Sequence, residues 1–360
     1  MKTYRVAVIG CSRMGAFIDN EVPDYQAIKL PYSHAAGFYA EERTDLAACS
    51  DLRTEVMEKF GKQYDVPKER QYTDYREMID KEQLDIVSIA TQPEHRAEIA
   101  IYAAENGVKA IYAEKAMAAS MDDADAMVEA VERNGVFFNL GTNRRWHTGF
   151  DKMKEIIDSG ELGRLRTLIT YSNGTLFNTA SHNFDLMLRL NSDHKASWVS
   201  AHLPNAEKII DGEIFREDPV GQGMIQFENG VMVHALLSPR NSDWEAICEK
   251  GSLTCWNNGW QWKLRRQATI PGWRTCSEEG TFPEFERTSS TANLIKDLVH
   301  ALDTGEPTRG GVRCAHANTE LIFAFMESHL RNGARVDLPL KGSKLRLKRD
   351  RAPRQPKFTL

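Results

Sequence analysis

Two short stretches of the chain carry side chains that could move a proton or stabilise a developing negative charge. In "AEKAMA", Glu114 and Lys115 follow an apolar run, and a lysine in such surroundings is costly unless a partner compensates it. In "NTASHNFDLM", His182 and Asp185 are one helical turn apart and can face one pocket. Histidine is suited to acid–base work near neutral pH. Taken alone, Glu114 and Lys115 could equally be a surface ion pair, and His182 could be a structural histidine.

A third stretch, "GCSRMG" at residues 10–15, has the spacing of a dinucleotide-binding loop, G-x-G-x-x-G, with Ser12 at the second glycine position. Gly10 would permit the tight turn, Gly15 would let helix and strand pack closely, and N–H groups at the helix start would bind a pyrophosphate. The alternative is an ordinary strand-to-helix turn. The cofactor-binding residues predicted here are Gly10, Ser12, Arg13, Met14 and Gly15.

The next two strand-like runs also end in polar residues. Asp51 closes "ACSD", where a carboxylate would bind the adenosine ribose and repel a 2′-phosphate, which favours NAD over NADP. Arg53 could instead accommodate NADP or stack on adenine, and Asp51 could also cap a helix. The run ending in "TQPEH" contains a proline that takes the chain out of the sheet at its ligand-binding edge. We predict that Thr91, Gln92 and His95 of this stretch also contact the cofactor.

The segments around these motifs predict an α/β domain over residues 1–142. Short apolar runs alternate with helical patterns such as "REMIDKE" and "DDADAMVEAVERNG". This alternation indicates βαβ units, hence a Rossmann domain with a parallel sheet and helices on both faces. The segment 17–33 is longer than the usual connection and is expected to be an ordered insertion. The predicted strands cover residues 4–10, 45–51, 85–91, 109–114 and 136–141.

From residue 143 onward the pattern changes. An amphipathic helix is followed by strand-like runs, with the hairpin signal "ENG" at 228–230, and helical patterns return near the end. This predicts an α+β domain over residues 143–345, built on a large, mostly antiparallel, open-faced sheet. Residues 346–360 form a basic C-terminal tail. Such a tail can bind anions, but it is more often solvated or laid over an acidic protein surface.

The composition of the 360-residue chain narrows the class of protein. With 41% hydrophobic and 27% charged residues it is ordinary for a soluble protein, and its length favours two domains. No apolar run is long enough for a membrane span, and "MKTYRVAVIG" leaves no room for a signal peptide. Six scattered cysteines argue for reduced thiols and against a zinc site. We therefore expect a cytoplasmic protein with neither membrane, nucleic acid nor metal as a partner.

Five stretches in order, "VAVIGCSRMG", "SDLR", "TQPEH", "AEKAMA" and "NTASHNFDLM", resemble the Gfo/Idh/MocA family of glucose–fructose oxidoreductase and inositol dehydrogenase. The resemblance covers nearly the whole chain and implies NAD(P)-dependent oxidation of a hydroxyl group on a sugar, sugar derivative or cyclitol. It implies that Lys115 reaches the nicotinamide ribose and the substrate, aided by Glu114, and that His182 is the acid–base. Ala116 stands where the family has proline, and Asn178 where it has aspartate.

The resemblance also places the "GTNRRWH" stretch toward the substrate, although an interdomain ion-pair crossing is the alternative. Asn178 and Asp185 are expected to act with His182 and Lys115 at the catalytic centre. The substrate-binding candidates are Lys115, Asn143, Arg144, Asn178, His182 and Asp185.

Two further expectations concern assembly and rival functions. Five of the seven tryptophans fall within 244–273, and in this family the open sheet face commonly forms the subunit interface, so a homodimer or homotetramer is expected. Stacking of these rings on a sugar is the alternative.

Two other functions stay open: a glycoside-cleaving enzyme that uses transient oxidation by tightly held NAD, and a non-enzymatic NAD-binding regulator.

Overall fold

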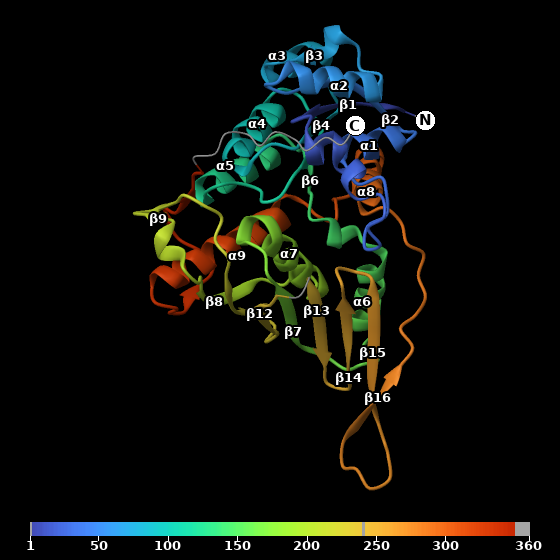
Figure 1. Ribbon diagram of the computed structural model, residues 1–360, viewed down its shortest axis with the longest axis vertical. Coiled ribbons are helices and arrows are strands. Elements are labelled where there is room, and N and C mark those ends of the chain that lie inside the picture. The colour runs from blue at the N-terminus through green and yellow to red at the C-terminus, as the bar shows by residue number, and fades with distance from the viewer. Residues whose placement is uncertain (1, 240–241, 350–360) are drawn as a thin grey trace. The chain divides into compact units, whose positions relative to one another are not determined.

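The computed structural model (Figure 1) describes residues 2–239 and 242–349. Contacts divide these residues into two units: residues 2–146 with Thr288–His316, and His147–Arg287 with Ala317–Arg349. Of the predicted basic tail, residues 350–360 lie outside the described residues. In the part of the chain that is described, no helix has the length and apolarity needed to cross a membrane.

The strands of the first unit are β1 (Tyr4–Ile9), β2 (Thr44–Ser50), β3 (Gln71–Tyr72), β4 (Ile86–Ile89), β5 (Ala110–Ala113) and β6 (Phe137–Leu140). They form a parallel sheet in the order β3-β2-β1-β4-β5-β6. The order reverses between β1 and β4, and doubly wound sheets bind ligands at the carboxyl edge beside this point. The predicted parallel α/β fold is therefore confirmed.

The α-helices of the first unit are α1 (His34–Ala40), α2 (Thr54–Tyr64), α3 (Tyr75–Glu82), α4 (Pro93–Glu105), α5 (Met121–Arg133) and α8 (Ser290–Thr304). Strand β1 shows why they cover both faces of the sheet. Val6 and Val8 pack into a hydrophobic cluster with side chains of α1, α2 and α8. Ala7 and Ile9, equally buried, point to the opposite face because side chains alternate along a strand.

The insertion predicted at 17–33 is hydrogen-bonded to its surroundings at its C-terminal end. It starts in a π-helical turn, η1 (Arg13–Phe17), and a 3₁₀ turn, η2 (Ile18–Glu21). The Asp19 carboxylate accepts from the backbone N–H groups of Tyr32 and Ser33, each at 2.8 Å. Thr291, on α8, donates its hydroxyl to the Tyr32 carbonyl at 2.9 Å. These bonds set where α1 begins.

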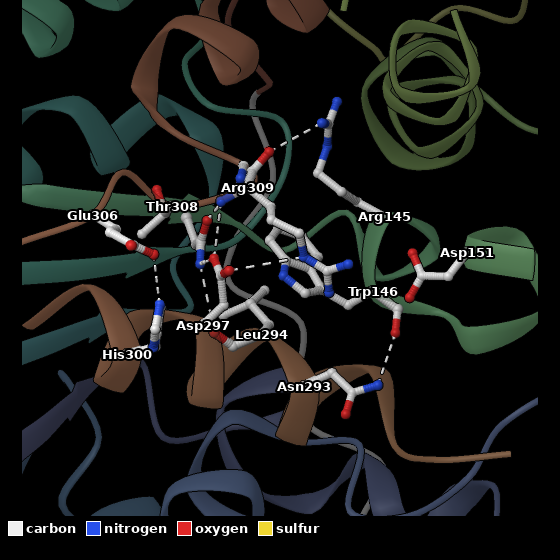
Figure 2. Close-up of polar contacts among 12 residues, drawn as sticks. Arg145, Trp146, Asp151, Asn293, Leu294, Asp297, His300, Glu306, Thr308 and Arg309 are labelled. Carbon is white, nitrogen blue, oxygen red and sulfur yellow. Dashed lines mark hydrogen bonds and ion pairs between the residues drawn. The ribbon is translucent and has the colours of Figure 1, made fainter. Parts of the chain in front are cut away.

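The chain returns to the first unit through α8 and the loop at 305–311 (Figure 2). Asp297 Oδ2 accepts from Asn139 Nδ2 at 2.9 Å and from the Arg309 N–H at 3.0 Å. The Arg309 carbonyl accepts from Nη1 of the fully buried Arg145 at 3.1 Å. Since Asn139 lies on β6, these bonds fasten the loop to the last strand of the parallel sheet.

We expect Asp297→Ala to lower the free energy of unfolding of the first unit by about 2 kcal/mol, because it removes the acceptor of two hydrogen bonds and leaves Asn139 Nδ2 only the longer bond to the Leu294 carbonyl. Thermal unfolding followed by circular dichroism measures this loss. His300→Ala is the matched control on the same helix: it removes only an exposed pair with Glu306, 2.8 Å long, worth at most about 1 kcal/mol. Equal losses in the two variants would contradict the fastening role of Asp297.

The second unit is built on a nine-stranded sheet in the order β16-β15-β14-β13-β7-β12-β11-β8-β17. Its strands are β7 (Leu165–Ser172), β8 (Ala196–His202), β11 (Gln222–Phe227), β12 (Met232–Leu237), β13 (Asp243–Cys248), β14 (Gly251–Trp256), β15 (Gln261–Ala268), β16 (Cys276–Gly280) and β17 (Val336–Asp337). Only β7 and β12 pair in parallel among these described strands. The predicted mostly antiparallel sheet is confirmed. Gly230 closes the predicted hairpin, donating to the Phe227 carbonyl at 3.0 Å.

A small sheet of the second unit joins β9 (Ile210–Asp211), β10 (Ile214–Phe215) and β18 (Arg346–Leu347). Its helices are α6 (Thr148–Ser159) and α7 (Ser181–Leu190), and α9 (Val312–Leu330) enters from the first unit.

The tryptophans of the 244–273 region have different environments. Trp244 is fully buried, and Trp262 packs edge-on against Phe150 of α6 with ring centroids 4.9 Å apart. Trp260 and Trp273 are exposed. Trp244 therefore belongs to the core of the unit and the half-buried Trp262 packs beside it, while the predicted subunit interface on this sheet stays a prediction.

Candidate functional site: the carboxyl edge of the parallel sheet and helix α7

The predicted dinucleotide loop directly follows β1. Gly10 has a φ of 89°, and a Cβ there would lie 3.0 Å from the Ala90 carbonyl carbon. A Cβ on Gly15 would lie 1.8 Å from the Gly10 carbonyl oxygen. Both positions therefore need glycine. Glycines at these positions are typical of a loop whose backbone approaches a pyrophosphate. The helix expected directly after the loop is limited to the turn η1, because the insertion follows it.

Asp51 and Arg53 meet at the end of β2. The buried Asp51 accepts from the Cys11 N–H through Oδ2 at 2.9 Å, which ties it to the glycine loop. Its Oδ1 accepts from the backbone N–H and the Nε of Arg53, each at 3.1 Å. The carboxylate expected to bind a ribose is thus paired with the guanidinium that could bind a 2′-phosphate.

Glu114 and Lys115 occupy the turn after β5. Oε1 of the buried Glu114 lies 3.2 Å from His34 Nε2, and Oε2 accepts from the Lys115 backbone N–H at 3.2 Å. The Lys115–Ala116 peptide bond is cis. Burial raises the pKa of Glu114, but the hydrogen bond and charge of His34, with the charges of Lys115 and Arg96, lower it below its ordinary value. The carboxyl group is therefore ionised at neutral pH.

Arg96, which sequence reasoning missed, holds the same turn from α4. It is 2% exposed, and its guanidinium donates to the carbonyls of Ala116 and Thr91, which follow β5 and β4. The only sequence signal is an arginine within the apolar helix pattern "HRAEIAIYAAE". Of the predicted cofactor residues here, Thr91 is half-buried, whereas Gln92 and His95 are exposed at the start of α4.

Asn143 and Arg144 lie in a 3₁₀ turn after β6, η4 (Asn143–Trp146). Asn143 is 6% exposed, and its Nδ2 donates to Thr291 Oγ1 at 3.2 Å. Its Oδ1 is buried and has no hydrogen-bond partner within the described part of the chain. Burial raises the pKa of Tyr32, and the charge of half-buried Arg144 acts against that rise. The turn η4 and the insertion therefore lie close to each other.

In the second unit, the predicted motif spans a π-helical turn, η5 (Leu176–Ala180), and α7. His182 and Asp185 are both buried, with 8% and 2% exposure, and are one turn apart on α7. Asn178 lies on η5 with an exposed side chain. The structure thus brings His182 and Asp185 together on one element, while Asn178 has a different environment.

Asp218, a second residue that the sequence did not reveal, anchors η5. It accepts from the backbone N–H groups of Phe177 and Asn178 at 2.9 and 3.0 Å, and from the Thr175 hydroxyl. Burial raises the pKa of Asp218 above its ordinary value even though these bonds oppose the rise. Its signal, the "EDPV" before a strand, does not differ from that of any loop carboxylate.

We expect Asp218→Asn to flatten the pH dependence of stability in the second unit. Because the folded-state pKa is raised above the ordinary 3.8, the native protein loses stability as pH rises from about 3.8 through that folded pKa. The substituted amide does not titrate, so the gap in Tm between variant and native protein should narrow as the pH rises from about 4. Glu213→Gln, at an exposed carboxylate, is the control. A constant gap for Asp218→Asn would refute this prediction.

A doubly wound parallel sheet, a glycine loop after β1 and a carboxylate after β2 define a Rossmann-type dinucleotide-binding protein. The family model for oxidoreductases with an NAD-binding Rossmann fold matches residues 4–142. Over these residues the chain matches the Gfo/Idh/MocA oxidoreductase family, which confirms the resemblance seen in its motifs.

Curated relatives are similar over part of their length. Myo-inositol 2-dehydrogenase of Thermotoga maritima is 23% identical over 244 residues, which cover 63% of this chain and 66% of the relative. D-apiose dehydrogenase of Paraburkholderia graminis is 32% identical over 164 residues, 45% of this chain and 38% of the relative. The chain thus spans less than two thirds of the length of these relatives.

Solved structures share the fold over nearly the whole chain. Aldose–aldose oxidoreductase of Caulobacter crescentus, complexed with glycerol, has a TM-score of 0.75 at 18% identity and covers 94% of this chain and 100% of its own. An Agrobacterium radiobacter oxidoreductase in complex with NAD+, L-tartaric acid and magnesium has a TM-score of 0.72 at 18% identity, covering 93% and 98%.

Proposed function

We propose that the protein is an NAD-dependent dehydrogenase that oxidises a secondary hydroxyl of a sugar, sugar derivative or cyclitol, or reduces the matching ketone. The observation that carries the proposal is the turn after β5, where the ionised, buried Glu114 holds the backbone of Lys115 at the carboxyl edge of the parallel sheet. The similarity to inositol and apiose dehydrogenases supports the substrate class.

The residues at the ends of β1 and β2 fit a dinucleotide. The loop needs glycine at Gly10 and Gly15, and the Asp51 carboxylate lies against it. Ser12, Arg13 and Met14 of the loop would contact the pyrophosphate, and Asp51 with Arg53 the adenosine ribose. The remaining contacts are assigned to Thr91, Gln92, His95, Glu114 and Lys115.

Bound NAD would supply the hydride acceptor, at nicotinamide C4. Lys115 would bind the hydroxyl oxygen of the substrate and stabilise the negative charge that develops on it. His182 would accept the hydroxyl proton while the hydride leaves the carbon that carried it. The substrate thus loses one hydride and one proton and becomes a ketone.

The polyol would be held by hydrogen bonds from several side chains. The buried Asn143 Oδ1 is suited to a hydroxyl donor, and the half-buried Arg144 can donate to hydroxyl oxygens. Asp185, beside His182 on α7, and Asn178 on η5 are assigned to the same substrate. Correct placement of the reacting carbon is the main task of these residues.

The test is a panel of sugars, sugar acids, glycosides and inositols incubated with NAD+, followed by NADH absorbance. For the substrate found, Lys115→Ala and His182→Ala should each lower kcat/KM by about 100-fold or more. Lys109→Ala and His194→Ala are the matched controls at exposed positions, and both should leave turnover unchanged. Unchanged turnover in Lys115→Ala or His182→Ala would refute the assignment, and product without net NADH would point to bond cleavage.

The preference for NAD over NADP follows from Asp51. We expect Asp51→Asn to raise the ratio of kcat/KM with NADP to that with NAD by about tenfold, because the amide no longer repels a 2′-phosphate and Arg53 remains beside it. Steady-state kinetics with both cofactors measures the ratio. A ratio that stays constant or falls would show that Asp51 does not set the preference.

A further inference from the structure

His34, the first residue of α1, is fully buried beneath the turn that carries Lys115. Its Nδ1 lies 2.7 Å from Ser88 Oγ on β4, and its Nε2 lies 3.2 Å from Glu114 Oε1. The ring stacks on Tyr112 of β5, with centroids 3.8 Å apart and planes 8° from parallel. A hydrogen-bonded chain therefore joins Ser88 on β4 to Glu114, and the stacked ring also contacts β5.

The chemistry of the partners assigns the direction of these bonds. An ionised carboxylate only accepts, so His34 Nε2 must carry the hydrogen that it shares with Glu114. Nδ1 accepts from the Ser88 hydroxyl when the imidazole is neutral and donates to Ser88 Oγ when it is protonated, and in both cases Nε2 donates to Glu114. The other Glu114 oxygen accepts from the Lys115 N–H, so partners on both sides orient the carboxylate.

The insertion at 17–33 determines where His34 lies. Helix α1 has seven residues, and Ser33 caps it by accepting from the Ala36 N–H at 3.3 Å. Asp19 accepts from the Ser33 N–H at 2.8 Å, and Thr291 donates to the adjoining Tyr32 carbonyl. A helix this short has little stability of its own, so these contacts hold its first residue in place.

We propose that His34 is a positioning residue for Lys115. It donates to Glu114, which keeps the carboxylate against the Lys115 backbone, and the insertion sets the place of His34. This inference rests on the proposed dehydrogenase function. If the inference holds, any side chain at position 34 that places a hydrogen-bond donor where Nε2 lies will serve.

Two substitutions of similar size separate the two ring nitrogens. His34→Gln puts an amide nitrogen at the position of Nε2 and can still donate to Glu114. His34→Asn puts it at the position of Nδ1, near Ser88, and cannot reach Glu114. We expect His34→Asn to lower kcat about tenfold or more with KM for NAD unchanged, and His34→Gln to restore kcat to within about threefold of the native value.

The pH profile gives a second readout. His34 lowers the pKa of Glu114, so its loss raises that pKa. If turnover needs the ionised carboxylate, the acidic limb of kcat moves to higher pH in His34→Asn, and it moves less in His34→Gln, which keeps the hydrogen bond to Glu114 but not the charge of His34. A purely structural role would lower the amount of folded protein without moving this limb.

Hydrogen exchange measured by mass spectrometry tests the positioning without a substrate. Peptides covering 110–118 should exchange faster in His34→Asn, and in Asp19→Ala, than in the native protein or His34→Gln. Tyr4→Phe is the control for general destabilisation. It removes a 2.6 Å bond to Asp303 at the amino end of β1 and should leave both exchange at 110–118 and kcat unchanged.

The outcomes separate the two proposals. If the native enzyme turns over no member of the panel, the proposed function fails, and the exchange comparison still decides the role of His34. If the native enzyme is active but His34→Asn and His34→Gln match each other in kcat and in exchange, the positioning inference alone is overturned. A faster exchange and lower kcat confined to His34→Asn support it.

Discussion

The buried carboxylate of Glu114 is the constraint on which the parallel-sheet edge depends. An ionised carboxyl removed from water needs hydrogen bonds and opposite charge. His34 and the Lys115 N–H bond to its two oxygens, and the charges of Lys115 and Arg96 help to keep it ionised. The turn that carries Lys115 is therefore held by electrostatics as well as by backbone geometry.

Meeting this constraint involves segments far apart in the chain. Thr291 accepts from Asn143 Nδ2 and donates to the Tyr32 carbonyl, so one hydroxyl on α8 links η4 to the insertion. The loop after α8 is fastened to β6 through Asp297. The return of Thr288–His316 to the first unit thus supports both the turn η4 and the placement of α1.

The second unit contains a buried carboxylate with the opposite behaviour. Asp218 bonds to two backbone N–H groups and a hydroxyl, and burial raises its pKa although these bonds and the charge of Arg349 oppose the rise. Glu114 has cationic neighbours, and its pKa falls. At Asp218 burial outweighs the hydrogen bonds and the charge of Arg349, whereas at Glu114 the hydrogen bond from His34 and three cationic neighbours outweigh burial. Both carboxylates orient a turn that leads to a proposed catalytic side chain.

The sequence by itself determined the features that depend on neighbouring residues. Alternation of apolar runs and helical patterns predicted the parallel strands, and the glycine spacing predicted the loop at 10–15, because each signal is local. His34, Arg96 and Asp218 were not found, since their partners are 80, 20 and about 40 residues away in the sequence. Only the tertiary structure decided these contacts, because burial and charge at a sheet edge arise from segments that meet after folding.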